Sequence, residues 1–556
     1  MRRPRSGATP SGCVPSAACP ETGVAQGRRA VNWGRVTRSL RSLDRLARAV
    51  PFVLLALLAL RLVQAIFAHS LWLDEWATLE GAFAPTSWGE RLFTLSGPAS
   101  VNFPTFYLAT RTLGGALAYG GQPVEAIVRL PATILTVVAL ALAVRWGVGR
   151  ARAGALAERA SVAGPWLGAA LVGILLTGGD WTEHGGEGRA YGPMAALAMA
   201  MMVAAARGRT GAACACGLGL VLLHPFGTLV GFAPSLAVLA AARLGLGDAL
   251  GLDRRTVRRV AWAAGVVFVL AALWIQMKYI GHQTGGYGLR KRGGDMAAVL
   301  AGLDLGAVLL FAGVTLAGGA ALVVLRRRGA LGAAPPQATF AALTFAAACG
   351  TLGLGAAALA IARPGVNVAM PRYVAWVVPS LVVGAAAGAA LLVDALAAGR
   401  ARRARVALAL AGALLAGGWS MAQLRTAPLG PTWADGLREA ARWVEQAAGP
   451  QSAVATDFRE IFELHPPFSE GYRCARAPQI VPYLSPAVRA RMACQDAAGR
   501  VAFGPEVREV LFVREPIPVT DGRAVVLDGF WRAAELRFGN AAVERWVRVD
   551  AELRSP

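Results

Sequence analysis

The stretch Leu71-Trp72-Leu73-Asp74-Glu75-Trp76 places two adjacent carboxylates between aromatic residues. It follows an apolar run, from about residue 47 to 68, that is long enough to cross a bilayer as a helix. The carboxylates therefore fall at the water-facing end of a first membrane span. Charge at that depth is costly unless it faces a cavity or binds a ligand. The plainer alternative is an interfacial acidic pair within an aromatic belt.

The composition is that of a polytopic membrane protein. Of 556 residues, 55% are hydrophobic and only 16% are charged, which excludes one large soluble domain. The net charge of +23 comes almost entirely from arginine, since Lys278 and Lys291 are the only lysines. The arginines lie in short clusters between apolar runs, which is the pattern of a positive-inside topology. We therefore expect no nucleic acid among the partners.

The basic clusters predict the topology. Clusters at 207–209 and 254–259 are both expected in the cytoplasm, so the apolar stretch 211–243 must cross twice, with His224-Pro225 at the external turn. Applied to the whole chain, this rule predicts eleven spans, a cytoplasmic N-terminus and an external C-terminus. The expected spans are 47–68, 127–144, 162–177, 190–206, two within 211–243, 260–277, 305–325, 338–362, 372–397 and 406–421.

Three regions are predicted along the chain. Residues 1–45 are rich in Arg, Pro, Gly and Ser and are expected to be a disordered cytoplasmic tail. Residues 46–422 form the transmembrane domain. Its first external loop, 69–125, is expected to hold short helices along the membrane surface, and the apolar segment 106–119 within this loop is not expected to cross the membrane. Residues 423–556 have the composition of a small soluble α/β domain outside the membrane. A helix is expected there at 433–447 and β-like runs at 453–455, 510–513, 524–527 and 546–549.

Two cysteines share this external domain. Cys474 and Cys494 are expected to form a disulfide there, because the compartment is oxidising. No spacing of Cys and His in the sequence resembles a zinc site.

Ionisable residues collect in the predicted external loops. They are Asp74, Glu75, Glu183, Glu187, Arg189, His224, Lys278, Arg363 and Arg372. An arginine at an external membrane edge, such as Arg189, can hold a lipid phosphate with several donors, although an ordinary polar loop would look similar. Arg372 opposes the positive-inside bias, and either phosphate binding or snorkelling to the head groups would account for it. A single histidine before a proline, such as His224, is more often a satisfied polar residue than a catalytic one.

The order of these motifs resembles the GT-C glycosyltransferases of the protein-mannosyltransferase and aminoarabinose-transferase superfamily, in the bacterial family 39-like branch. The motifs are Leu71-Trp72-Leu73-Asp74-Glu75, Glu187-x-Arg189-x-Tyr191, Leu222-Leu223-His224-Pro225-Phe226, and Arg372-Tyr373 with Pro379 downstream. The resemblance covers about residues 46–400. The chain departs from the family at Asn102-Phe103-Pro104, where His-Pro-Pro is common, and at Gly186, where glutamine often precedes the glutamate.

The resemblance implies a GT-C-like fold and an inverting sugar transfer at the outer face of a bacterial inner membrane. The donor would be a polyprenyl-phosphate sugar, and the acceptor a lipid, glycan or protein. Asp74 would be the general base and Glu75 its neighbour or a metal contact. The donor phosphate would be bound by Arg189, Arg372 and Lys278, supported by Glu187, Tyr191, His224 and Tyr373. No cofactor is implied with certainty, and a divalent metal stays open.

Two other functions remain as alternatives. One is a polymerase or ligase of surface glycans that uses a diphosphate-linked donor. The other is a lipid or solute transporter. Transporters commonly carry internal repeats and ionisable residues near the membrane midplane. This sequence shows no clear repeat, and its ionisable residues lie at one membrane edge, so the pattern favours the enzyme.

Overall fold

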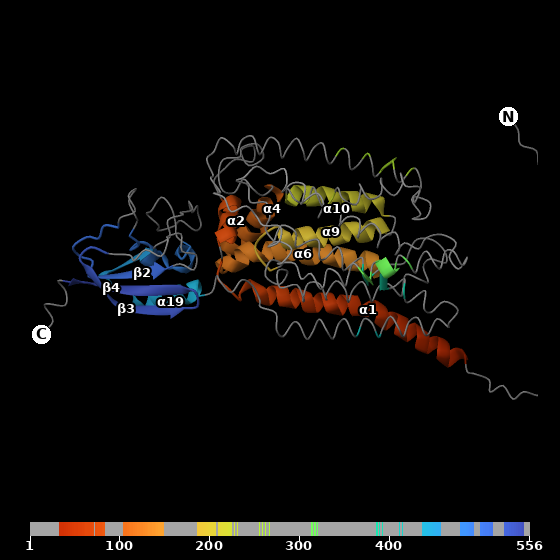
Figure 1. Ribbon diagram of the computed structural model, residues 1–556, viewed down its shortest axis with the longest axis horizontal. Coiled ribbons are helices and arrows are strands. Elements are labelled where there is room, and N and C mark those ends of the chain that lie inside the picture. Colours follow the sequence, from red (N-terminus) through yellow and green to blue (C-terminus); the bar gives the residue numbers. More distant parts are fainter. Residues whose placement is uncertain are drawn as a thin grey trace, which may run out of the picture. The chain divides into compact units, whose positions relative to one another are not determined.

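The structure is a computed structural model of the 556-residue chain (Figure 1). It describes residues 33–71, 73–83, 104–148, 186–206, 209–224, 436–456, 479–493, 501–514 and 527–549, with isolated residues between 227 and 414. Residues 1–42 form one unit and residues 43–556 another.

Helix α1 runs from Trp33 to Ile66 and contains the first predicted span. The disorder predicted for residues 1–45 is therefore wrong from residue 33 onward. Neither glycine nor proline interrupts residues 35–50, and their leucines, alanines and arginines favour a helix that continues into the span. The part Ala49–Ile66 is long and apolar enough to cross a membrane.

Helix α1 has one buried apolar face and one exposed apolar face. Leu54, Leu58 and Leu62, spaced four residues apart, are buried on one face. Phe52, Leu60 and Val63 are large, apolar and exposed. A second exposed apolar face is unfavourable in water and is the pattern of a helix that contacts lipid.

Helix α6, from Val124 to Val148, is the second helix that could cross a membrane by length and composition in the described part of the chain. It contains the predicted span 127–144. Ile134, Val138 and Leu142 form an exposed apolar stripe at four-residue spacing, as on α1.

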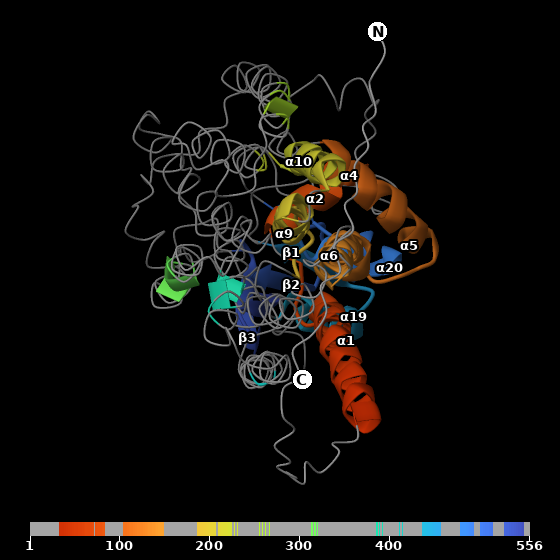
Figure 2. The same ribbon diagram turned by 90° about the vertical axis from the view of Figure 1, so that its right-hand side faces the viewer.

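Helices α9 and α10 pack beside α6. The helix predicted at 190–206 is confirmed by α9, Tyr191–Ala206, and α10 runs from Thr210 to Leu223. Figure 1 shows α9 between α6 and α10, and Figure 2 shows the three side by side from the end. The buried face of α9 is rich in alanine and methionine, and small residues let helices approach closely.

The predicted turn at His224 is confirmed. Helix α10 ends at Leu223 and His224 is extended, the conformation that a following proline favours. Further on, an added Cβ at Gly231 would lie 3.5 Å from the carbonyl oxygen of Gly217. The chain therefore turns back along α10. Whether this hairpin makes two complete crossings stays a prediction.

The first external loop begins with α2, Leu73–Phe83. Short helices follow, as predicted: α4, Pro104–Ala109, a π-helical turn over Thr110–Gly114, and α5, Gly115–Tyr119. They pack against α2, α6 and α10. Their orientation along a membrane surface stays a prediction.

The C-terminal region contains a four-stranded mixed sheet in the order β1-β2-β4-β3. Its strands are β1, Ser452–Thr456, β2, Glu509–Arg514, β3, Phe530–Phe538, and β4, Ala541–Arg548. β1 and β2 are parallel, and the other pairs are antiparallel. The helix predicted at 433–447 is observed as α19, Leu437–Ala447.

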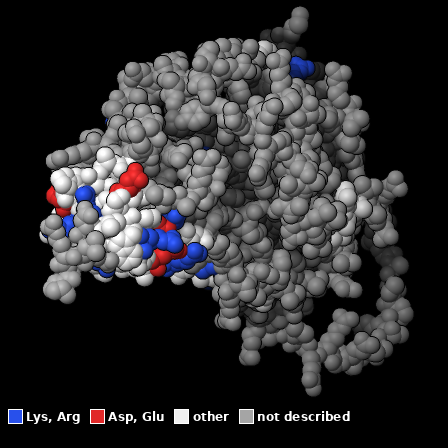
Figure 3. All heavy atoms as spheres, turned by 60° about the vertical axis from the view of Figure 1, so that its left-hand side comes forward, with Lys and Arg blue, Asp and Glu red and all other residues white. Residues whose placement is uncertain are grey.

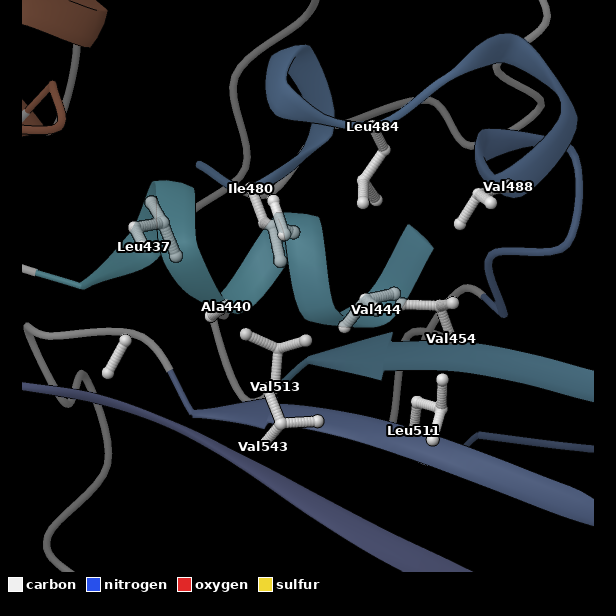
Figure 4. Packing of buried hydrophobic residues seen from close by; sticks show 12 residues of the cluster. Leu437, Ala440, Val444, Val454, Ile480, Leu484, Val488, Leu511, Val513 and Val543 are labelled. Atoms are coloured by element: carbon white, nitrogen blue, oxygen red, sulfur yellow. The ribbon is translucent and has the colours of Figure 1, made fainter. Parts of the chain in front are cut away.

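The core of this region lies between α19 and the sheet. Figure 4 shows Leu437, Ala440 and Val444 of α19 facing Leu511 and Val513 of β2, among other buried side chains. The helix is therefore held by an apolar stripe of the usual i, i+3, i+7 spacing.

Strand β3 was not predicted. Between its two ends, every side chain of β3 is exposed, so the strand lacks the apolar alternation that reveals a half-buried strand. Its charges pair along the surface instead, as Arg532 does with Glu535 and Glu544. Figure 3 shows charges of both signs together on this region. The β-like run predicted at 524–527 is described only at Leu527, which lies outside the strands.

Several predictions fall outside the described residues. They include the span 162–177, most of the spans after 231, and both Cys474 and Cys494. The eleven-span count and the disulfide therefore stay predictions. One later contact is described: an added Cβ at Gly318 would lie 2.3 Å from the Cα atom of Gly388. The segments predicted as spans 305–325 and 372–397 thus approach closely at these glycines.

Candidate functional site

The candidate site lies where α2, α6 and the segment 186–190 meet. Asp74 lies in α2, whose bounds include it, but its side chain is outside the described part. Glu75, Glu187, Arg189, Tyr191 and His224 are described and buried. Lys278, Arg372 and Tyr373 lie outside the described residues, so their place relative to this site stays a prediction.

Glu75 forms a buried two-point ion pair with Arg129 of α6. The Nε atom of Arg129 donates to Oε1 of Glu75 and its Nη2 atom to Oε2, both at 2.7 Å. The Glu75 side chain is fully buried and that of Arg129 is 3% exposed. Such planar, parallel hydrogen bonds are the strong geometry for arginine and a carboxylate.

The same guanidinium closes the corner between α1 and α2. Its remaining N–H groups donate to the carbonyl oxygens of Ile66 at 2.9 Å, His69 at 2.7 Å and Ser70 at 2.9 Å. Together with the bonds to Glu75, these use all five donors that arginine has. Arg129 thus fixes the backbone that leads into the acidic motif.

The second motif reaches the same carboxylate through its backbone. The N–H of Gly188 donates to Oε1 of Glu75 at 2.7 Å, across 113 residues of sequence. Only glycine fits here, because an added Cβ would lie 2.2 Å from Cγ1 of Val128. This close approach sets Glu187 and Arg189, on either side of Gly188, beside α2 and α6.

Arg189 lies over the neighbouring aromatic residue. Its guanidinium carbon is 5.8 Å from the ring centre of Tyr191, within cation–π range. Its Nη1 atom lies 3.3 Å from the hydroxyl of Thr78 in α2. The Tyr191 ring in turn packs at 5.6 Å against the His224 ring. The structure therefore brings three sequence motifs together: the acidic pair, Glu-x-Arg-x-Tyr, and His224-Pro225.

This geometry makes Glu75 a structural anchor. Its two carboxylate oxygens are engaged by Arg129 and Gly188, an arrangement that neutralises and desolvates the group. Within the described part of the chain, no group of three or more His, Cys, Asp or Glu residues could hold a metal ion. The metal role that was left open for Glu75 gains no support from this arrangement.

Arg129 and Glu125 are not among the site residues predicted from the sequence. Both lie in the first two turns of α6 and are 2% exposed. The signal was present, because two opposite charges four residues apart at the end of an apolar span are costly unless they have partners. The partners themselves lie far away in the sequence, so the signal could not name them.

Comparison with solved structures finds ArnT from Cupriavidus metallidurans in the apo state, at 15% identity and a TM-score of 0.44, covering 92% of this chain and 98% of ArnT. ArnT bound to undecaprenyl phosphate matches with the same identity and TM-score over 93% of this chain. An oligosaccharyltransferase from Archaeoglobus fulgidus matches at 13% identity and a TM-score of 0.40, covering 83% of this chain and 67% of the other.

These neighbours are GT-C glycosyltransferases. No family model matches the chain, and no curated protein matches it.

Proposed function

We propose that this chain is an integral-membrane glycosyltransferase. It moves a sugar from a polyprenyl-phosphate donor to a hydroxyl of a lipid, glycan or protein acceptor. The observation that carries the proposal is the meeting of two motifs at Glu75. Its carboxylate binds the backbone of Gly188, so that the helix carrying Asp74 lies beside the segment carrying Arg189. The reaction needs a carboxylate and a cation, and these two neighbouring segments carry one of each.

The chemistry assigns different tasks to the two charges. The acceptor hydroxyl is a weak nucleophile and needs a base within reach, which is the role of Asp74. The acceptor oxygen forms its bond to the anomeric carbon as the bond from that carbon to the phosphate oxygen breaks. The acceptor proton passes to Asp74, and polyprenyl phosphate leaves. A single displacement of this kind inverts the anomeric configuration.

Cations stabilise the departing phosphate, because negative charge develops on it in the transition state. We assign this role to Arg189 and, from the sequence motifs, to Arg372 and Lys278. Glu187, Tyr191, His224 and Tyr373 support them, as Tyr191 does by packing against Arg189. Glu75 holds the site together through Arg129.

The proposed setting is the outer face of a bacterial inner membrane. The exposed apolar stripes of α1 and α6 support a lipid environment for these helices. The basic clusters support a cytoplasmic N-terminus and an extracytoplasmic C-terminal domain, 423–556, with 46–422 as the transmembrane domain.

The test is sugar transfer in membranes supplied with radiolabelled polyprenyl-phosphate hexoses and pentoses. Asp74→Asn keeps the size of the side chain and removes the base, so turnover should fall by about 10²–10⁴-fold at equal expression. Asp528→Asn, at an exposed position of the C-terminal region, is the matched control and should transfer normally.

Three outcomes would contradict the proposal. Near-normal transfer by Asp74→Asn would show that Asp74 is not the general base. Transfer from diphosphate-linked donors alone would favour the glycan polymerase or ligase. Movement of labelled lipid across the membrane without transfer would favour a transporter.

A further inference from the structure

The turn between α1 and α2, residues 67–71, is held from two sides. From α6, Arg129 donates to the carbonyl of His69 at 2.7 Å. From α19 in the C-terminal region, Arg438 donates to the same carbonyl at 3.2 Å and to that of Phe67 at 3.0 Å. The carbonyl oxygen of His69 therefore links two guanidinium groups: that of Arg129, which binds Glu75 in the candidate site, and that of Arg438, which lies 369 residues after His69.

The turn also caps α19. The residue before the helix, Gly436, has φ of 97° and gives the helix no side-chain cap. An added Cβ there would meet the carbonyl oxygen of Phe538, so no serine or aspartate can take its place. Instead, the hydroxyl of Ser70 accepts from the backbone N–H of Arg438 at 3.0 Å. The turn thus supplies from a distance the acceptor that an N-cap residue normally supplies.

The charge on Arg438 is placed against the usual preference. A cation in the first turn of a helix opposes the helix dipole, so it needs a compensating anion. That anion is Glu125 at the start of α6, whose Oε1 accepts from Nε of Arg438 at 2.8 Å and from Nη2 as well. Glu125 is 2% exposed and the side chain of Arg438 20%. Two negative and two positive charges therefore compensate one another around this turn. They belong to Glu75 with Arg129 and to Glu125 with Arg438.

A neutral contact completes this arrangement. The hydroxyl of Tyr483 accepts from the N–H of Leu71 at 2.8 Å. Tyr483 ends the short 3-10 helix Val481–Tyr483 of the C-terminal region and packs against buried apolar residues of α2 and α6. Leu71 stands three residues before Asp74. The C-terminal region thus fixes the backbone immediately before the proposed base.

We propose that Arg438 and Tyr483 are positioning residues, through which the C-terminal region holds the 67–71 turn and thereby the acidic motif in place for sugar transfer. Neither side chain takes part in the chemistry. The effect on catalysis rests on the proposed function. The coupling between the C-terminal region and the 67–71 turn does not depend on it. The C-terminal region would then contribute to the position of the acidic motif in the candidate site.

The coupling is tested first, by hydrogen exchange on the full chain in detergent micelles. Tyr483→Phe removes the acceptor of the Leu71 N–H and keeps the ring. Arg438→Gln removes the charge and the donors to the turn. Both should speed exchange in peptides that cover residues 67–75. Arg442→Gln changes an exposed arginine of the same helix and should leave exchange as in the unaltered chain.

The consequence is tested by steady-state transfer from the labelled polyprenyl-phosphate panel. A base displaced by about 1 Å loses on the order of 10²-fold in rate, so Arg438→Gln should lower kcat by roughly tenfold to a hundredfold. The KM for the donor should stay unchanged, because no residue of the 67–71 turn is assigned to phosphate binding. Arg442→Gln should keep both constants.

Each result decides one point. Faster exchange together with lower kcat supports the proposal. Unchanged exchange in both variants overturns the coupling. Faster exchange with unchanged kcat, or a kcat that falls only with the amount of folded protein, overturns the positioning role. If the unaltered chain transfers no sugar from any donor, the proposed function fails, and the exchange experiment still decides the coupling.

Discussion

Replacing Arg129 by methionine tests how the candidate site is held together. Methionine keeps much of the apolar stem and removes all five donors. The variant leaves the fully buried Glu75 carboxylate with the backbone N–H of Gly188 and without its ion-pair partner. Removing one partner of a buried ion pair typically costs about 3–5 kcal/mol, a large share of a total stability of about 5–15 kcal/mol. We therefore expect Arg129→Met to be severely destabilised.

A second variant separates the orphaned charge from the lost backbone contacts. In Glu75→Gln/Arg129→Met neither member of the buried ion pair carries a charge. The carbonyls of Ile66 and Ser70 still lose the bonds from Arg129, whereas that of His69 keeps the one from Arg438. At about 1 kcal/mol for each lost bond, the double variant should be roughly 2 kcal/mol less stable than the unaltered chain. It should thus be more stable than Arg129→Met alone.

The assay is equilibrium unfolding in mixed micelles, followed by tryptophan fluorescence. Arg145→Met, at an exposed position near the other end of α6, is the control and should cost less than about 1 kcal/mol. Strong non-additivity between the two sites is the expected signature. If Arg129→Met loses no more than the control, or if the two changes add, the account of Glu75 as a buried anchor is wrong.

Three further outcomes follow from single contacts. Gly188→Ala should cost about 1–3 kcal/mol, because its Cβ would overlap Val128, whereas Gly211→Ala, with nothing within 4 Å, should leave the unfolding midpoint unchanged or raised. Burial, followed by the nearby acid, raises the pKa of Tyr483 well above its usual value. Its contribution to stability is therefore complete below about pH 10 and lost as the pH rises through the raised value, so the difference in unfolding midpoint from Tyr483→Phe should shrink in alkaline buffer. Arg189→Lys should weaken binding of a polyprenyl phosphate in a pull-down, because a point charge lacks the planar fork; unchanged binding would leave Arg189 a structural residue.

Some elements could be read directly from the sequence. The long apolar helices α1 and α6, helix α9 and the turn at His224 all follow from local signals. These signals are apolar runs of sufficient length, their periodicity and a proline. The order of the motifs also gave the resemblance to glycosyltransferases and, with it, the candidate residues Asp74 and Arg189.

Local signals failed where an element depends on its surroundings. Helix α1 begins at Trp33 because helix-forming residues continue the span, although their basic composition resembles that of a disordered tail. Strand β3 has almost no buried side chain, and it forms because β4 offers it a backbone to pair with. In α1 helix propensity outweighs the basic composition, and in β3 pairing with the neighbouring strand outweighs the lack of an apolar pattern.

The partners of the buried charges were decided by tertiary structure alone. The sequence marks Glu75, Glu125 and Arg129 as charges at the ends of apolar helices, and each must be paired to be buried. It does not mark which charge pairs with which, because Arg129 lies 54 residues from Glu75, and Arg438 lies 313 residues from Glu125. A pairing over such distances leaves no local pattern. The pairing exists only once the helices are packed. The sequence therefore reveals the acidic motif, whereas only the folded chain shows which arginines hold it in place.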